Sequence, residues 1–183
     1  MGMTGKGRFM WVFGYGSLLW NPGFMPVRRV TARLPDYHRS FCMLSIHHRG
    51  TPNHPGLVLA LDHQPGGQCT GVAFQVAPQD KVTVLAMLRE RELVSSAYVE
   101  QEVPLICDTG DRITALAYVV DRTHIQYCQF DLEQQAQMIA HATGGRGPNT
   151  EYLYNTVTHL AEIGIKDADM AWLADRVRAL TAT

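Results

Sequence analysis

Cysteine is scarce in this chain, and its spacing does not suit metal binding or disulfide pairing. The four cysteines are far apart and include no C-x-x-C pair: Cys42, Cys69, Cys107 and Cys128. Zinc sites and disulfide-dense secreted scaffolds both depend on closely spaced cysteines. The pattern therefore argues against both classes and favours a reduced, cytoplasmic location.

Long apolar runs and basic clusters are also missing. Charged residues make up 18% of the 183 residues, the formal net charge is −1, and no basic run occurs. Nucleic acids and anionic membranes both attract clustered positive charge. No stretch reaches 20 apolar residues, and Met1–Gly7 is too short and polar for a signal peptide. The sequence thus predicts a small-molecule substrate, no nucleic acid and no membrane, and a disordered tail over residues 1–7.

A glycine-rich stretch near the start, VFGYGSLLW, lacks the spacing of the common phosphate and nucleophile motifs. A dinucleotide fingerprint needs a third glycine where Leu19 stands, and no Lys-Ser or Lys-Thr pair follows as in a P-loop. A hydrolase elbow, G-x-S-x-G, needs glycine at Tyr15 and Leu19. What remains is a strand that ends in a turn with exposed N–H groups and a tyrosine at its tip.

Metal ligands and activated nucleophiles are not recognisable either. The eight histidines show no H-E-x-x-H or other metal spacing, so the sequence predicts no metal site. Ser17 has no base near it in the sequence. No cysteine lies next to the N-terminus of a predicted helix, where the positive end of the helix dipole would lower its pKa. Covalent catalysis stays open as an alternative, because the partners of a triad can come from anywhere in the chain.

The first two thirds of the chain read as short strands separated by turn residues. Runs rich in Val, Phe, Tyr and Ile predict strands at Met10–Phe13, Val27–Leu34, Arg39–Ile46, Leu57–Asp62, Gly71–Val76, Ala97–Ile106 and Ile113–Val120. One helix interrupts them: it begins near Pro78, and Val82, Leu85 and Leu88 recur along it at a spacing of three.

The last third of the chain is predicted to be helical. Asp131 is expected to cap a helix that ends at Gly144-Gly145. A second helix begins near Asn149 or Thr150, and a third runs from about Asp167. Strands followed by helices predict an α+β fold, a small closed or partly closed β-barrel with flanking helices, because closure removes exposed strand edges. We expect residues 8–183 to form a single domain.

Two polar stretches stand out against this background. Leu88–Leu93, LREREL, places Glu92 where the helix gives way to an apolar segment; partial desolvation there raises a carboxylate pKa toward the range of a general acid and base. A solvated helix end is the plainer interpretation of such a charge cluster. Gly144–Leu153, GGRGPNTEYL, fits a helix end, a turn and the next helix start.

Taken together, the motifs resemble the ChaC family of glutathione-specific γ-glutamylcyclotransferases. The resemblance rests on VFGYGSLLWNPGF near the start, HRGTPNHPGLVLAL from His48, GVAFQV from Gly71, LRERELVSSAY from Leu88 and GPNTEYL from Gly147. These segments follow the family's order and spacing over roughly residues 10 to 160. The resemblance implies a small mixed β-barrel with flanking helices, in agreement with the strand pattern.

The resemblance also assigns roles to individual residues. It implies that Tyr15, Gly16, Ser17 and Leu18 form the substrate-holding loop and that Glu92 is the catalytic carboxylate. The duplicated Arg-Glu pair leaves Glu90 as an alternative, although the spacing to Tyr98 favours Glu92. Arg49 is a weaker candidate for an anionic end of the substrate, and Tyr118 either lines the pocket or packs in the core. Leu93–Ser96 departs from the Lys and Gly-Gly turn of many relatives.

The implied reaction is an intramolecular cyclisation. The α-amine of a γ-glutamyl group attacks its own γ-carbonyl, closes the ring of 5-oxoproline and expels Cys-Gly in the case of glutathione. Backbone N–H groups of the loop are expected to bind the substrate carboxylate, and one carboxylate moves the proton. The scheme needs no metal, nucleotide or other cofactor.

Two other functions stay open at this point, and so does the oligomeric state. An enzyme of the same fold would use the same loop and carboxylate on another γ-glutamyl amide or amine. A non-catalytic γ-glutamyl-binding module would be expected to lack the carboxylate, whereas Glu92 is present.

Overall fold

The computed structural model describes residues 9–93 and 96–182. Two compact units share the chain: Met1–His38 with His63–Val119, and Arg39–Asp62 with Val120–Thr183. The tail expected at residues 1–7 lies outside the described residues, and the single domain stays a prediction. None of the described helices is both long and apolar enough to cross a membrane.

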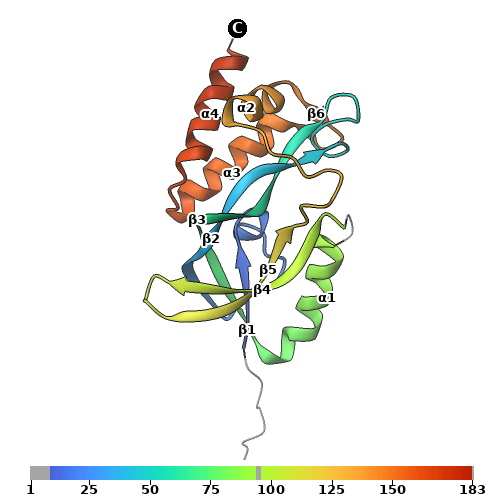
Figure 1. The fold of residues 1–183 in the computed structure, drawn as a ribbon. Coiled ribbons are helices and arrows are strands. Elements are labelled where there is room, and N and C mark those ends of the chain that lie inside the picture. Colours follow the sequence, from blue (N-terminus) through green and yellow to red (C-terminus); the bar gives the residue numbers. More distant parts are fainter. Residues whose placement is uncertain (1–8, 94–95, 183) are drawn as a thin grey trace, which may run out of the picture. The chain divides into compact units, whose positions relative to one another are not determined.

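Five strands form a closed barrel (Figure 1). Around the barrel the order is β1-β3-β2-β4-β5, where the strands are β1 (Met10–Gly14), β2 (Arg28–Ser45), β3 (Gly56–Val76), β4 (Tyr98–Cys107) and β5 (Arg112–Val120). β1 pairs antiparallel with β3 and parallel with β5, at Val12 and Leu116. The barrel is therefore mixed, and the predicted α+β barrel with flanking helices is confirmed.

Two long strands replace four predicted short ones. β2 runs through the expected break between Leu34 and Arg39, and β3 runs through the expected break between Asp62 and Gly71. The prediction of separate strands was wrong because the turn residues form irregular positions within the strands. Asp36 and Gly66 have φ of 64° and 79°, and neither residue ends its strand. The Gly66 N–H donates to the Asp36 carboxylate at 2.9 Å, which stabilises this irregular stretch.

Helix α1 (Lys81–Glu92) follows a 3-10 turn, Pro78–Asp80, and packs on the barrel within the first unit. Its buried Val84 and Leu88 share one apolar cluster with Val12 of β1 and Tyr118 of β5. β1 is therefore covered on both faces, which is why its sequence is an apolar run and not an alternating one.

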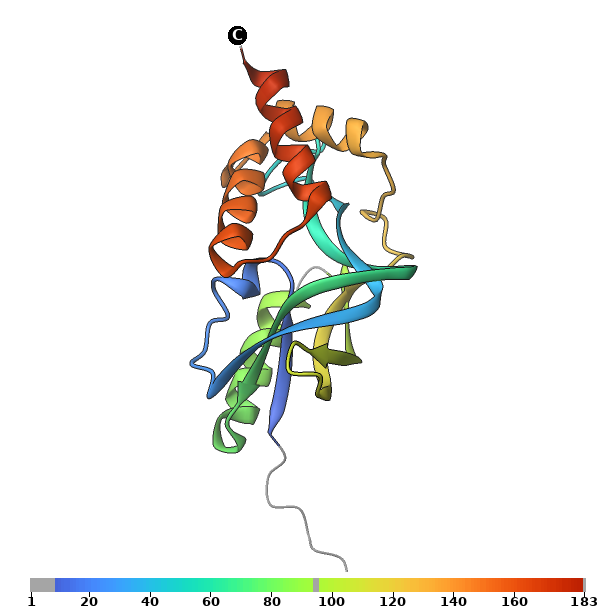
Figure 2. The same ribbon diagram turned by 90° about the vertical axis from the view of Figure 1, so that its left-hand side faces the viewer.

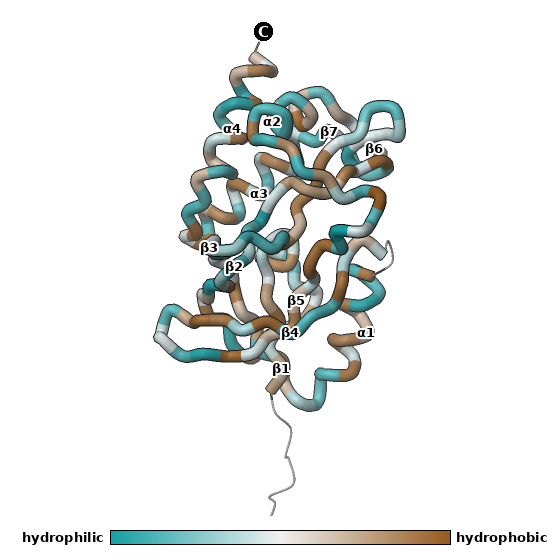
Figure 3. Tube along the Cα trace, viewed as in Figure 1, coloured by the Kyte–Doolittle hydropathy of each residue, from teal (hydrophilic) through white to brown (hydrophobic). Residues whose placement is uncertain are grey.

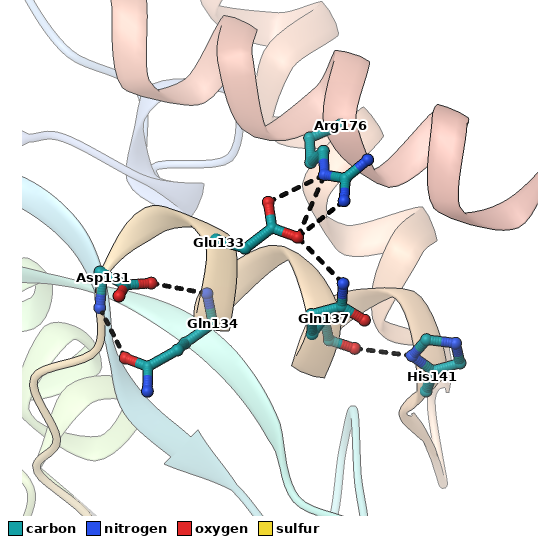
Figure 4. A network of polar contacts seen from close by, with 6 residues as sticks. All are labelled: Asp131, Glu133, Gln134, Gln137, His141 and Arg176. Atoms are coloured by element: carbon teal, nitrogen blue, oxygen red, sulfur yellow. Dashed lines mark hydrogen bonds and ion pairs between the residues drawn. The ribbon is translucent and has the colours of Figure 1, made fainter.

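The second unit contains α2 (Leu132–His141), α3 (Asn149–Ile163) and α4 (Ala168–Thr181), which pack against one another (Figure 2). Apolar and polar segments alternate along α2 and α4 (Figure 3). Asp131 caps α2 as predicted: its carboxylate accepts from the Gln134 N–H while the Gln134 side chain accepts from the Asp131 N–H (Figure 4).

The end of α2 differs from the prediction. The helix stops at His141, and Gly144 lies in a short hairpin formed by β6 (Thr143–Gly144) and β7 (Gly147–Pro148). A Cβ at Gly144 would stand 2.5 Å from the Gly50 nitrogen. Glycine is therefore required here by the close approach of another backbone segment and not by the helix end.

Candidate active site

Glu92 is the last residue of α1, and its carboxylate is largely withdrawn from water. The side chain is 16% exposed. Burial raises the pKa of the Glu92 carboxyl above its ordinary value, and the positive charge of Arg91 opposes that rise. A carboxylate with a raised pKa is suited to exchanging protons near neutral pH.

Helix geometry separates Glu92 from the alternative, Glu90. The buried Leu88 fixes which face of α1 packs on the barrel, and residues three and four positions later lie on that same face. Those positions are Arg91 and Glu92, whereas Glu90 falls two positions after Leu88 and is exposed. Glu90 thus has the environment of a surface charge.

The stretch Tyr15–Leu18 begins directly after β1, and its last two residues are the first two of a 3-10 helix, Ser17–Leu19, in the same unit. The first bond of this helical turn runs from the Leu19 N–H to the Gly16 carbonyl at 2.8 Å. The N–H groups of Ser17 and Leu18 precede that bond and have no partner within the turn. The loop is thus built to present donors to an acceptor.

The glycine that ends β1 has a packing reason. A Cβ at Gly14 would stand 2.8 Å from a ring carbon of Phe74 on the paired strand β3. Glycine allows the aromatic ring to lie directly against the strand where it turns into the loop.

Arg91 joins the loop to the end of α1, a role that the sequence analysis missed. Its guanidinium donates to the Ser17 hydroxyl at 3.0 Å and to the Asn21 carbonyl at 2.6 Å, and its Nε lies 3.5 Å from a Glu92 oxygen. The loop and the carboxylate are thus brought together by one side chain. The signal available in the sequence was the position of Arg91 three residues after the buried Leu88.

Tyr118 of β5 lies in the same part of the first unit. Its side chain is 1% exposed, and its hydroxyl oxygen is, among the residues described, the one buried side-chain polar atom without a hydrogen-bond partner. Burial, together with the negative charges of Glu100 and Glu92, raises the pKa of the hydroxyl. The hydroxyl is therefore protonated and available to donate, an arrangement typical of functional sites.

Tyr15 makes a different contribution from Tyr118. Its hydroxyl donates to the backbone carbonyl of Tyr118 at 3.0 Å, and the side chain is buried. Because this proton is already used within the protein, the geometry favours Tyr15 as a wall that fixes the loop and not as a donor to a ligand.

Arg49 belongs to the second unit, where its guanidinium has several local partners. It donates to the Pro148 carbonyl at 3.1 Å, lies 3.6 Å from a Glu151 carboxylate oxygen and sits over the Tyr152 ring. These contacts favour a structural role, and binding of substrate by Arg49 stays a prediction.

The GPNTEYL segment also has a structural role in the second unit. The buried Asn149 side chain accepts from the Leu57 N–H and donates to the Leu57 carbonyl, both at 2.8 Å. A Cβ at Gly56 would stand 2.7 Å from the Asn149 oxygen, so glycine is needed beside it. The motif thus ties the start of α3 to β3, a contact that its sequence did not predict.

Three of the four thiols are in environments that make them poor nucleophiles. Burial raises the pKa of Cys42 and Cys107 above their ordinary values and that of Cys128 to about 11. Thiolate is the reactive form, so this environment disfavours covalent catalysis by these cysteines. The described residues include no cluster of three His, Cys, Asp or Glu side chains placed to hold a metal ion.

Comparisons with known proteins agree on one family. The chain is 34% identical over 175 residues to the glutathione-specific γ-glutamylcyclotransferase of Escherichia coli K12, covering 94% of this chain and 74% of that one. It is 32% identical over 178 residues to glutathione-specific γ-glutamylcyclotransferase 1 of Homo sapiens, covering 94% and 80%.

A solved structure shows the same fold. The crystal structure of the yeast γ-glutamylcyclotransferase specific to glutathione superposes with a TM-score of 0.82 and 22% identity, covering 96% of this chain and all of that one. The family model described as ChaC-like protein matches residues 10–180, and the chain therefore belongs to the ChaC-like protein family.

Proposed function

We propose that this protein is a glutathione-specific γ-glutamylcyclotransferase that converts glutathione to 5-oxoproline and Cys-Gly. The observation that carries the proposal is Glu92, a desolvated carboxylate held beside the Tyr15–Leu18 loop through Arg91. The relatives from Escherichia coli and Homo sapiens that bear this name match nearly the whole chain.

The reaction is a transfer within one molecule. The α-amine of the γ-glutamyl group attacks the γ-carbonyl, the new C–N bond closes a five-membered ring, and the bond to the cysteine nitrogen breaks. Nucleophile and electrophile already share a molecule, so much of the entropic barrier is absent from the start. What the enzyme supplies is proton transfer, a bent substrate conformation and stabilisation of the oxyanion.

Glu92 moves the proton in this scheme. Its carboxylate accepts a proton from the substrate ammonium, which frees the amine to attack, and returns it to the departing cysteine nitrogen. The ring nitrogen then loses a second proton, which the released amine of Cys-Gly takes up, so the protons balance. A base must be ionised in the free enzyme and become a useful acid once protonated, and a raised pKa brings the two states closer in energy.

The loop and Tyr118 hold the γ-glutamyl group. The N–H groups of Ser17 and Leu18 and the Ser17 hydroxyl bind the α-carboxylate as donors. Tyr118 donates a hydrogen bond to the substrate from its hydroxyl, which has no partner among the described residues. Tyr15 forms a wall that keeps the substrate bent. No step requires a metal ion or nucleotide.

A substrate panel separates this proposal from an enzyme of the same fold that uses other γ-glutamyl compounds. Purified protein is incubated, without added metal or nucleotide, with reduced glutathione, γ-glutamylalanine or γ-glutamyl-lysine, and 5-oxoproline is followed by mass spectrometry. Formation of 5-oxoproline and Cys-Gly from glutathione alone is expected. Turnover of another compound in its place would move the activity to that substrate class.

Two matched variants test the base within the same assay. Glu92→Gln keeps the shape of the side chain but cannot accept a proton, and its turnover is expected to fall at least ~100-fold. Glu90→Gln makes the same chemical change on the exposed face of α1 and is expected to leave turnover unchanged. The opposite outcome, loss in Glu90→Gln alone, would assign the base to Glu90.

A further inference from the structure

Among the residues that the structure describes, Arg91 makes three polar contacts, which join the loop after β1 to Glu92. One terminal nitrogen donates to the Ser17 hydroxyl, the other donates to the Asn21 carbonyl, and Nε faces a Glu92 oxygen. A planar guanidinium has its donors in a fixed fork, so these three partners are held in one fixed arrangement.

The loop backbone is shaped to reach this fork. Gly23 has φ of 80°, and a Cβ there would stand 2.9 Å from the Met87 sulfur and 3.7 Å from an Arg91 nitrogen. The positive φ favours glycine at this turn, where the chain after Asn21 passes close to α1. The contact is therefore supported from both sides, by helix position and by loop conformation.

The bond to Ser17 sets the direction of its hydroxyl. A hydroxyl has one proton to donate and accepts through its lone pairs, and arginine donates only. Because Ser17 accepts from Arg91, its own proton points to another acceptor. The γ-glutamyl carboxylate is the acceptor that the proposed reaction brings to this loop.

We propose that Arg91 is a positioning residue of the cyclisation, which fixes the Ser17 hydroxyl and the Glu92 carboxylate relative to each other. This inference rests on the proposed function. Arg91 is assigned to positioning and not to substrate binding, because the contacts that its guanidinium makes go to Ser17, Asn21 and Glu92. Its loss is therefore expected to lower kcat more than it raises KM.

The same guanidinium also affects the charge state of Glu92. Arg91 on α1 supplies the positive charge that lowers the carboxyl pKa against the effect of burial. Tyr118 on β5 faces Glu92, and the pair formed by Arg89 and Glu100 faces Tyr118 from α1 and β4. Of these charged groups, Arg91 is the one whose removal is expected to raise the pKa of Glu92.

Two substitutions separate the roles of geometry and charge. Arg91→Met keeps the aliphatic stem without the charge or the fork, and kcat is expected to fall about 100-fold, the scale of a misplaced catalytic group. The acid limb of its kcat/KM profile moves to higher pH. Arg91→Lys keeps the charge, so the acid limb stays in place, while the loss of the fork lowers kcat about tenfold.

Arg178→Met is the control for the chemical change itself. Arg178 lies in the last turn of α4 in the second unit and is exposed, with Asp175 as its ion-pair partner. Thermal unfolding and circular dichroism of all variants establish that they are folded. Wild-type kcat and an unmoved acid limb are expected for this control.

The outcomes separate this inference from the proposed function. Inactive Glu92→Gln together with an Arg91→Met protein that retains kcat within twofold would overturn the positioning role alone. Wild-type turnover in Glu92→Gln would instead overturn the proposed base. If Arg91→Met does not fold, Arg91→Lys decides: a tenfold loss with an unmoved acid limb supports the inference, and wild-type kcat overturns it.

Discussion

The two units of the chain differ in the polar groups that they bury. In the second unit, Arg39, Ser45, Asp62, Gln135, Asn149 and Thr156 are buried polar residues, and each has a hydrogen-bond or ion-pair partner there. In the first unit, by contrast, the buried Tyr118 hydroxyl has no partner among residues 9–93 and 96–182, and the Glu92 carboxylate is desolvated.

This difference separates polar groups that build the fold from those that are available for chemistry. A buried donor whose partner is another protein group contributes to stability, whereas one that lacks a partner costs free energy in the absence of a ligand. Asp62 illustrates the first case, because Arg122 and Tyr127 both donate to its carboxylate, at 2.8 and 2.7 Å. In the first unit, the Tyr118 hydroxyl and the Glu92 carboxylate thus lower the stability of the substrate-free protein where the substrate is expected to bind.

Asn149→Leu is expected to give the largest loss of stability. The substitution removes both bonds to the Leu57 backbone and leaves a buried N–H and a buried carbonyl without partners. At about 1–3 kcal/mol for each of these two unsatisfied groups, the free energy of unfolding falls by roughly 2–6 kcal/mol. Urea denaturation followed by circular dichroism measures the change.

Asn155→Ala is the matched control for Asn149→Leu. Asn155 lies on the same helix, α3, but is exposed. A change within about 0.5 kcal/mol is expected for this surface position. Equal effects from the two substitutions would contradict the structural role assigned to Asn149.

Tyr118→Phe is expected to separate activity from stability in the first unit. The change removes a hydroxyl that has no partner in the described structure, so the free energy of unfolding stays the same or rises by up to about 1 kcal/mol. The lost hydrogen bond to the substrate lowers kcat/KM by about tenfold. Calorimetry and the 5-oxoproline assay measure the two effects.

Tyr127→Phe provides the contrast for Tyr118→Phe. The Tyr127 hydroxyl donates to the buried Asp62 and accepts from Gln129. Its removal is therefore expected to cost stability, by about 1–3 kcal/mol, as a bond to a charged group. If both tyrosine variants lose stability equally, the distinction between the units fails.

The pH dependence of Glu92 gives a smaller effect on stability. Its pKa is raised in the folded protein, so the folded state holds its proton more tightly than the unfolded chain. This contribution to stability is present below the unfolded pKa and is lost as pH rises through the folded pKa. Glu92→Gln is thus expected to be more stable than wild type at neutral pH and to lose that advantage in acid.

Thermal unfolding of wild type and Glu92→Gln at several pH values tests the sign. Turnover by the wild type has the opposite pH dependence, because Glu92 must be ionised to act as a base. Activity is therefore expected to fall as pH drops through the raised pKa of Glu92. Parallel unfolding curves for the two proteins at every pH would contradict the desolvation of Glu92.

Much of the fold was predictable because it depends on local signals. Apolar runs located the strands, Asp131 marked the start of α2, and the ordered motifs identified the family. The continuity of β2 and β3 was missed because Asp36 and Gly66 read as turn residues, and only the bond between them explains why the strands continue. The sequence shows residue types but not which distant pairs meet.

The candidate site was predictable in its residues but not in its connections. Glu92 and the Tyr15–Leu18 loop were named from motifs, and their assignment to catalysis and binding stays a prediction. The fork from Arg91 to Ser17 and Asn21 spans 74 and 70 positions in the sequence, and no local pattern indicates such a contact. The i+3 spacing from Leu88 was the available signal that Arg91 lies on the side of α1 that meets the loop.

Glu133→Gln is expected to have the smallest effect, although its contacts are numerous. Hydrogen bonds from Arg176 and Gln137 lower the pKa of the Glu133 carboxyl to about 2, and this network joins α2 to α4 on the surface (Figure 4). A lowered pKa stabilises the folded protein above the ordinary carboxyl value, and the benefit is lost as pH falls toward 2. Solvent screens exposed pairs, so the melting temperature at neutral pH is expected to change little and less still at high salt. A loss of stability as large as that of Asn149→Leu would show that exposed contacts contribute as much to the stability of the second unit as buried contacts do.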